Sequence, residues 1–404
     1  MDYQLDRPSV TPAERELRAD LVGRAVKLVP QLAANAQRTE DGRRVPDENI
    51  SAIEEAGLFT IMQPRRYGGL EVDFRTKLEV TRELARGCGS TAWATSLMNV
   101  CAWFTGLWNE QAQDDVWRED PANRVAGVFA PTGTAEPVEG GFQVTGKWGW
   151  ASGCLHSQWA LVGIPILGED GQLADQGLVL IPMSDLTIED TWFVTGMKGT
   201  GSNTLVAEDV FVPAHRYISV FGMLAGVVDN PHKDEVLYRA PFVPGAAIIL
   251  AGPQLGLAQA ALDLVLEKAP KRGIAYTFYD TQVDAPSFQL AVSKAASLID
   301  SAHLHAYRAA ADIDEAALHG VFPDYTARAR VRMDTGRAIV LAREAIRELV
   351  SAHGASSFAD STPMQRIWRD SEVASRHAVA NPEISAEVYG RALLGFSSGV
   401  SPLV

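Results

Sequence analysis

Residues 139–153, which read EGGFQVTGKWGWASG, decide the fold of this 404-residue chain, because here a helical pattern gives way to a strand pattern. Glu139-Gly140-Gly141 supplies a turn at the start of the stretch. After the turn, large apolar side chains occupy alternate positions, the spacing of a strand with one buried face. They are Phe142, Val144, Trp148 and Trp150. We therefore predict a strand here, inside a β domain.

Further short strands are predicted on the C-terminal side of this stretch. They cover residues 159–164, 178–181, 186–188 and 204–212. Six or so short strands separated by turn residues favour a small sandwich or barrel. We place this central β domain at residues 123–222.

The two flanks of the β domain have a helical period. Thr11-Pro12-Ala13-Glu14 is a capping box with proline at the first helical position, which predicts a helix start. Beyond about Gly252, small residues such as Ala295 and Ala302 recur at helical spacing and let helix axes approach closely. We predict an α+β, mostly α chain with an N-terminal helical domain (1–122) and a C-terminal helical bundle (223–404).

The composition excludes several classes of partner. The chain has 36 Lys+Arg against 50 Asp+Glu, and its net charge of −14 repels nucleic-acid phosphates and anionic lipids. Its longest apolar run, residues 243–250, is far shorter than a membrane span. Three cysteines without a paired spacing indicate a reducing compartment, and residues 1–10 carry no signal-peptide pattern. We expect a cytoplasmic protein with no nucleic-acid or membrane partner.

Three sequence patterns are similar to known binding motifs, but the residues around them argue against each function. Residues 141–147 match the phosphate-loop spacing GxxxxGK, but Trp148 replaces the required Ser/Thr and the segment alternates like a strand. The glycines at 196, 199 and 201 precede a strand pattern, which argues against a Rossmann loop. His303 and His305 point about 200° apart on a helix, so we expect one packed and one exposed histidine and no metal site.

Four motifs occur in one order along the chain. They are PRRYGG (64–69), GKWGWAS (146–152), GMKGTGS (196–202) and PMQRIWRD (363–370). Together they resemble the acyl-CoA dehydrogenase superfamily across nearly the whole chain. The resemblance implies an N-terminal helical domain, a central β-sandwich or barrel and a C-terminal four-helix bundle. It also implies a homotetramer in which the C-terminal helices pack across subunits and the flavin site is shared.

One departure narrows the resemblance to a branch. Dehydrogenases of the superfamily commonly carry a catalytic glutamate eight residues after the Arg-Asp pair, where this chain has Ala378. The chain instead resembles the flavin-dependent monooxygenases, such as the oxygenase components of p-hydroxyphenylacetate hydroxylases. These take reduced FMN or FAD from a separate NAD(P)H-dependent flavin reductase. They form a C4a-hydroperoxyflavin with O₂ and hydroxylate a phenolic or polycyclic aromatic substrate.

The resemblance implies roles for four residues. Ser152 matches the position that hydrogen-bonds near the flavin N5 atom. Trp150 is expected to wall the ring by stacking, with Trp148 as a second candidate. His377 matches a C-terminal histidine that deprotonates or orients the phenol, for which an ordinary pKa of about 6.5 is suitable.

Further candidates follow from the same resemblance. Arg272 and Gln289 lie in the stretch that contacts the flavin of a neighbouring subunit, and Thr200 and Ser202 are candidates for its phosphate oxygens. The remaining candidates line the substrate pocket: Cys101, Trp103, His156 and Asp300. Cys101 stands where phenol-hydroxylating relatives often carry a histidine, and we interpret it as a small buried hydrophobe.

Three alternatives stay open at the level of the sequence. An N-oxygenase of an amino sugar or another amine would need no phenol deprotonation, so His377 would be dispensable. An acyl-CoA dehydrogenase would hold oxidised FAD tightly. A non-enzymatic binding protein could retain the fold alone.

Overall fold

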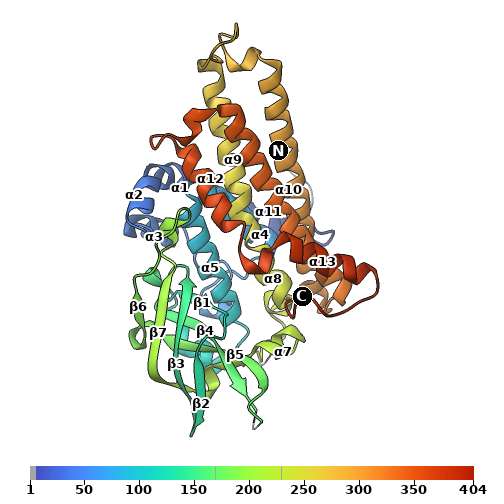
Figure 1. Cartoon of the computed structure of the whole chain (residues 1–404). Coiled ribbons are helices and arrows are strands. Elements are labelled where there is room, and N and C mark those ends of the chain that lie inside the picture. Colours follow the sequence, from blue (N-terminus) through green and yellow to red (C-terminus); the bar gives the residue numbers. More distant parts are fainter. Residues whose placement is uncertain (1–5, 169, 229) are drawn as a thin grey trace.

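The protein is described by a computed structural model that covers residues 6–168, 170–228 and 230–404. Residues 1–5, on which part of the signal-peptide argument rests, lie outside this range. Helices from the two ends of the chain form one long body, and a β-sandwich packs at one end of it (Figure 1). The predicted order of helices, strands and helices is confirmed.

The N-terminal helices begin as the sequence predicts. The hydroxyl of Thr11 accepts a hydrogen bond from the Glu14 amide, and the Glu14 carboxylate accepts one from the Thr11 amide, so the capping box is confirmed. The helices of this part are α1 (Pro12–Ala34), α2 (Ala36–Asp41), α3 (Asp47–Glu55), α4 (Phe74–Gly87), α5 (Gly89–Thr105) and α6 (Glu110–Trp117).

The β domain is a sandwich of two four-stranded sheets, as predicted. Its strands are β1 (Val125–Val128), β2 (Thr134–Val138), β3 (Gly141–Ala151), β4 (Trp159–Leu167), β5 (Leu173–Pro182), β6 (Thr187–Glu189), β7 (Asn203–Pro213) and β8 (Tyr217–Ser219). One sheet has the order β1-β4-β5-β8 and the other β2-β3-β7-β6. The sheets enclose a hydrophobic core of their own. The GxxxxGK stretch lies within β3, so it is not a phosphate loop.

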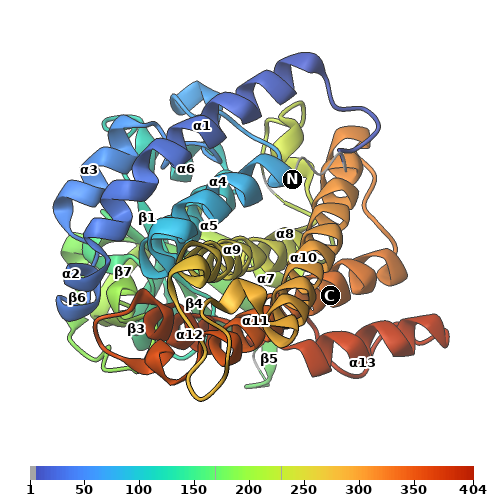
Figure 2. The ribbon, with the colours of Figure 1, turned by 90° about the horizontal axis from the view of Figure 1, so that it is seen from above.

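The C-terminal part is a bundle built around one apolar helix, α9. Its helices are α7 (Val220–Leu224), α8 (Phe242–Ile248), α9 (Ala251–Lys268), α10 (Pro286–His319), α11 (Tyr325–His353), α12 (Pro363–Ala374) and α13 (Pro382–Leu393). α9 packs against α4, α10, α11 and α12 (Figure 2). A β-carbon on Gly256 would lie 2.1 Å from the Arg82 carbonyl oxygen of α4, so glycine is what permits this close approach. The region Phe242–Lys271 is apolar enough to cross a membrane, but 78% of its most apolar stretch is buried inside the protein.

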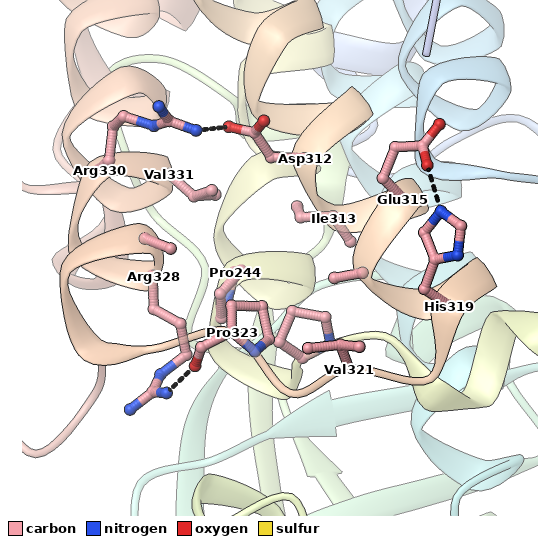
Figure 3. Close-up of a pocket in the computed structure, with 13 residues that line it drawn as sticks. Pro244, Asp312, Ile313, Glu315, His319, Val321, Pro323, Arg328, Arg330 and Val331 are labelled. Carbon is pink, nitrogen blue, oxygen red and sulfur yellow. Dashed lines mark hydrogen bonds and ion pairs between the residues drawn. The ribbon is translucent and has the colours of Figure 1, made fainter. Parts of the chain in front are cut away.

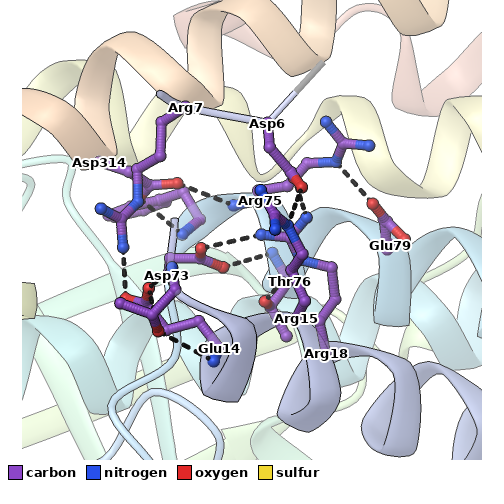
Figure 4. Close-up of polar contacts among 12 residues, drawn as sticks. Asp6, Arg7, Glu14, Arg15, Arg18, Asp73, Arg75, Thr76, Glu79 and Asp314 are labelled. Carbon is purple, nitrogen blue, oxygen red and sulfur yellow. Dashed lines mark hydrogen bonds and ion pairs between the residues drawn. The ribbon is translucent and has the colours of Figure 1, made fainter. Parts of the chain in front are cut away.

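Helices from both ends of the chain share one hydrophobic core, separate from that of the sandwich. A polar cluster at the start of α4 joins them further (Figure 4). The carboxylate of Asp314 on α10 accepts hydrogen bonds from the amides of Phe74 (2.8 Å) and Arg75 (3.2 Å). Asp73 caps the same helix and pairs with Arg18 of α1 at 3.1 Å. The N- and C-terminal helices therefore pack as one body, and the division at residues 122 and 222 stays a prediction.

Candidate active site

The end of β3 presents one tryptophan to solvent and buries another. The pairing of β3 with β7 shifts register between Trp148 and Ala151, and Trp150 adopts a left-handed backbone with φ of 71°. Its side chain is 70% exposed and meets Trp192 edge-on at 4.9 Å between ring centroids. Trp148 is fully buried, and its indole N–H donates to the Gly163 carbonyl at 2.7 Å. Trp148 is thus a core residue of the sandwich and not a wall of an open site.

Ser152 belongs to a chain of buried hydroxyl groups. Its Oγ lies 2.8 Å from Ser202 Oγ, which lies 2.6 Å from Thr200 Oγ1. The Thr200 hydroxyl donates to the Met197 carbonyl at 2.9 Å. The structure therefore engages Thr200 and Ser202 with Ser152, and their expected contact with flavin phosphate stays a prediction.

The loop that carries these hydroxyls docks on α12. The Met197 amide donates to the buried carboxylate of Asp370 at 2.5 Å, and burial raises the pKa of that carboxyl to about 6. A β-carbon on Gly196 would lie 2.2 Å from the Arg369 carbonyl oxygen. The motifs GMKGTGS (196–202) and PMQRIWRD (363–370) therefore contact each other. This contact explains the glycine at position 196 and the aspartate at position 370.

Trp93 connects Ser152 to His377, and the sequence analysis missed it. Its indole N–H, on α5, donates to Ser152 Oγ at 3.2 Å. The ring centroids of Trp93 and His377 are 5.9 Å apart. Trp93 gives little signal in the sequence, because it lies in a helix that is buried on every side along almost its whole length.

The protonation of His377 differs from the sequence-based expectation. Burial lowers its pKa to about 4, although the side chain keeps some exposure. Its Nδ1 accepts a hydrogen bond from the Val379 amide at 3.4 Å. The imidazole is therefore neutral at pH 7 with its proton on Nε2, and it presents a hydrogen-bond donor.

Arg272 and Gln289 lie away from this cluster. The guanidinium of Arg272 contacts His353 Nε2 at 2.7 Å and donates to Ser356 Oγ at 2.9 Å, and the amide of Gln289 donates to the Val283 carbonyl at 2.8 Å. The segment that joins α9 to α10 lies at the end of the bundle remote from the sandwich (Figure 1). A single chain does not bring these residues to Ser152.

The four pocket candidates lie in different surroundings. Cys101 is buried, burial raises the pKa of its thiol, and its Sγ packs beside Gly127 of β1. Trp103 is fully buried among phenylalanines, with its indole N–H bonded to the Leu237 carbonyl at 3.2 Å. His156 is buried with a pKa lowered to about 4 by burial, and its Nδ1 lies 3.9 Å from the Asp47 carboxylate. Asp300 is half-buried on α10, where its charge acts on His303.

A cleft of about 350 Å³ opens elsewhere, at the turn between α10 and α11 (Figure 3). An ion pair between Arg330 and Asp312 at 2.5 Å and a hydrogen bond between His319 and Glu315 at 3.1 Å flank it. Neither Ser152 nor His377 lines this cleft.

The geometry can be set beside known proteins. Residues 11–119 match the family "Acyl-CoA dehydrogenase, N-terminal domain" and residues 248–382 match "Acyl-CoA dehydrogenase, C-terminal domain". The flavin-dependent monooxygenase oxygenase subunit HsaA of Mycobacterium tuberculosis is 37% identical over 92% of this chain and 94% of its own. The chain belongs to the acyl-CoA dehydrogenase superfamily. Within that superfamily it belongs to the flavin-dependent monooxygenase branch.

Two further proteins are similar to this chain over most of their length. The p-hydroxyphenylacetate 3-hydroxylase oxygenase component of Acinetobacter baumannii is 32% identical over 91% of this chain and 87% of its own. The structure of XiaF from Streptomyces sp., in complex with FADH2 and glycerol, superposes with a TM-score of 0.89. It is 38% identical and covers 97% of this chain and 98% of XiaF.

The side chains at the end of β3 are of the kinds that bind a flavin. An exposed indole held in a strained conformation, as at Trp150, is the kind of surface on which an isoalloxazine ring stacks. A serine hydroxyl, as at Ser152 two residues further along the chain, is a group that can bond a ring nitrogen. Among residues 6–168, 170–228 and 230–404, no three His, Cys, Asp or Glu side chains form a group that could hold a metal ion.

Proposed function

We propose that this chain is the oxygenase component of a two-component flavin-dependent monooxygenase that hydroxylates a phenolic or polycyclic aromatic compound. The observation that carries the proposal is the cluster of Ser152, Trp93 and His377, in which Ser152 follows the exposed Trp150 by two residues. It offers a hydrogen-bonding hydroxyl for a flavin and a neutral histidine for a substrate. The HsaA and hydroxyphenylacetate relatives favour this function over acyl-CoA dehydrogenation and amine N-oxygenation.

Trp150 and Ser152 would hold the isoalloxazine ring of reduced FMN or FAD. When bound, the reduced flavin supplies the electrons with which O₂ is activated for transfer of one oxygen atom. FADH2 is the first flavin to test, because the XiaF structure contains it. Burial of Ser152 and Trp93, which are 8% and 7% exposed, would keep water away from the reacting ring.

The flavin site is completed, in this proposal, by a second copy of the chain in a homotetramer. Arg272 and Gln289 cannot reach Ser152 within one chain, so their flavin contacts would be made across a subunit interface. Exposed apolar side chains gather in the same segment and support an interface there. They are Leu266, Tyr276, Phe278, Val283 and Leu290.

His377 would bind the substrate oxygen as a hydrogen-bond donor. A neutral imidazole with its proton on Nε2 donates a hydrogen bond to the oxygen of a bound phenol and so fixes which ring carbon faces the flavin. A pKa of about 4 makes this histidine a weak proton acceptor. The role proposed is therefore orientation of the phenol and not removal of its proton.

The surroundings of Cys101 indicate an apolar substrate. A histidine at this position would offer a second polar contact, but the buried thiol packs against Gly127 and offers none. One turn further along α5, Phe104 meets Phe129 edge-on at 4.8 Å. A polycyclic phenol that makes one polar contact, through His377, suits these surroundings.

A separate NAD(P)H-dependent reductase would supply the reduced flavin, by transient contact or by free diffusion. The "oxygenase component" names of the relatives support such a partner. We place the reaction in the cytoplasm, because all three cysteines are free and buried.

The test mixes anaerobic protein carrying reduced FAD or FMN with oxygenated buffer. We expect bound flavin to release H₂O₂ and return to its oxidised spectrum later than free reduced flavin does. In the presence of phenols such as 2-naphthol, we expect hydroxylated product in place of H₂O₂. Immediate return to oxidised flavin, with turnover of acyl-CoA thioesters, would contradict the proposal.

The same assay tests His377. His377→Ala should lower product per reduced flavin about tenfold or more and raise H₂O₂ by the amount lost, because the substrate oxygen loses its donor. His377→Gln, which keeps an N–H donor, should recover part of the product formed per reduced flavin. His319→Ala, at an exposed histidine, is the matched control. If His377→Ala formed as much product per reduced flavin as wild type, the result would favour the N-oxygenase alternative.

A further inference from the structure

The hydroxyl chain beside Ser152 has a fixed direction. The Met197 carbonyl can only accept, so the single hydroxyl hydrogen of Thr200 points to it across 2.9 Å. Thr200 Oγ1 must then accept the hydrogen of Ser202 across 2.6 Å, and Ser202 Oγ must accept that of Ser152 across 2.8 Å. We call Thr200, Ser202 and Ser152, with the Met197 carbonyl, the hydroxyl relay.

The relay leaves Ser152 as an acceptor. Its only hydrogen is committed to Ser202, and one of its two lone pairs receives the indole N–H of Trp93 at 3.2 Å. The second lone pair is the remaining hydrogen-bonding capacity of the hydroxyl. A ligand atom that meets this oxygen must bring its own hydrogen to make a bond.

We propose that the hydroxyl relay makes the site select reduced over oxidised flavin. The N5 atom of a flavin carries a hydrogen when the ring is reduced and is a bare acceptor when it is oxidised. An acceptor at Ser152 therefore bonds the reduced ring and faces the oxidised ring lone pair to lone pair. This inference rests on the proposed function, since it needs Ser152 at N5, and it assigns Thr200 and Ser202 as positioning residues.

The size of the selectivity follows from the hydrogen bonds of the relay that are lost when oxidised flavin binds. To donate to a bare N5, Ser152 must turn its hydrogen, Ser202 and Thr200 must turn theirs in sequence, and the bond from Thr200 to the Met197 carbonyl is lost. One net hydrogen bond corresponds to roughly 2- to 12-fold in an equilibrium constant. The relay should contribute a factor of this order to the ratio of the two dissociation constants.

The decisive variant is Thr200→Val, which keeps the shape of the side chain and removes the anchor of the relay. The Met197 carbonyl still receives the Trp192 indole N–H at 3.0 Å and the Thr200 amide at 3.2 Å, so the loop keeps its other bonds. Ser202 can then donate to Ser152, which frees the Ser152 hydrogen for an oxidised N5. The relay loses its direction without losing Ser152.

The experiment measures flavin binding and not turnover. Dissociation constants for reduced FAD (anaerobic) and oxidised FAD are measured by ultrafiltration for wild type, Thr200→Val and Ser202→Ala, and the measurements are repeated with FMN. We expect the oxidised-to-reduced ratio to fall roughly 2- to 12-fold in both variants. Thr335→Val, which removes another buried hydroxyl bonded to a carbonyl at 2.9 Å, should leave the ratio unchanged.

The outcomes separate the inference from the function on which it rests. Unchanged ratios in folded Thr200→Val and Ser202→Ala, with tight reduced-flavin binding in wild type, would overturn the relay and leave the oxygenase proposal intact. Failure of wild type to bind reduced flavin would overturn the proposed function itself. In a protein that already carries Ser152→Ala, neither Thr200→Val nor Ser202→Ala should change the oxidised-to-reduced ratio of dissociation constants.

Discussion

At the scale of single residues, Lys77 is the most unusual ionisable group in the core. Its side chain is fully buried on α4, and Nζ donates to Thr81 Oγ1 (2.7 Å) and Ser96 Oγ (2.8 Å). Among the described residues no carboxylate pairs with it, and burial lowers its pKa to about 7. Between pH 7 and 10, Lys77 is therefore protonated in the unfolded chain and has released its proton in the folded chain. Raising the pH through this range favours folding through Lys77.

Lys77→Met should consequently stabilise the protein most at pH 7 and progressively less toward pH 10. The difference in unfolding free energy between variant and wild type should shrink by up to about 1.4 kcal/mol per pH unit. The buried thiols of Cys88, Cys101 and Cys154 act in the opposite direction, but they are present in both proteins and cancel. Urea denaturation at several pH values measures the difference. Lys294→Met, at an exposed lysine paired with Glu348, is the control for replacing a lysine by methionine.

Trp148 and Trp150 show what alternation in the sequence can and cannot predict. Both were predicted on one strand face, yet one is in the core and the other is 70% exposed. The cause is the register shift between Trp148 and Ala151, which no apolar pattern encodes. The prediction that Ser152 lies at the site rested on resemblance, whereas its bonds to Ser202 and Trp93 required the fold.

At the scale of elements, the loop of residues 196–202 depends on glycine at its first position. In Gly196→Ala the new β-carbon would lie 2.2 Å from the Arg369 carbonyl oxygen and 2.5 Å from its carbon, and neither backbone can yield cheaply. We expect a loss of about 1–3 kcal/mol of unfolding free energy. Reduced flavin should also bind less tightly, because the loop carries the hydroxyl relay.

The matched control for this prediction is Gly23→Ala in the middle of α1. A β-carbon there would meet nothing within 4 Å, and alanine is the better helix former, so the variant should gain about 0.5–1 kcal/mol. Both values are measured by urea denaturation at pH 7. A Gly196→Ala protein as stable as wild type would show that the loop can leave α12 without cost.

Elements with strong local signals were predictable from the sequence, whereas three of the four shortest strands were not. The capping box at Thr11 fixed the start of α1, and the four strand runs after β3 are found as β4 to β7. β1, β2 and β8 were missed, because strands of 3–5 residues carry few positions from which a period can emerge, although β6, with three residues, was predicted. The contact between residues 196–197 and 369–370 joins segments more than 170 positions apart, and the sequence analysis did not predict it.

At the scale of the whole molecule, the remote end of the bundle exposes large aromatic side chains. Tyr276 and Phe278 are fully exposed, and Tyr276 adopts a left-handed backbone with φ of 59°. Exposed aromatic residues held in this way rarely face only water. Since Arg272 and Gln289 belong to the same segment, subunit assembly and flavin affinity should depend on it together.

Phe278→Asp should therefore disrupt both properties at once. A charge placed in the proposed interface must be desolvated without a partner, so we expect sedimentation velocity to show species smaller than the wild-type oligomer. Reduced FAD should bind at least about tenfold less tightly in the dissociated protein, because contacts from the second chain are lost. Leu173→Asp, at a half-exposed position on β5, is the control and should change neither property. A Phe278→Asp protein that dissociates yet binds flavin normally would confine the flavin site to one chain, and Arg272 and Gln289 would then have no part in it.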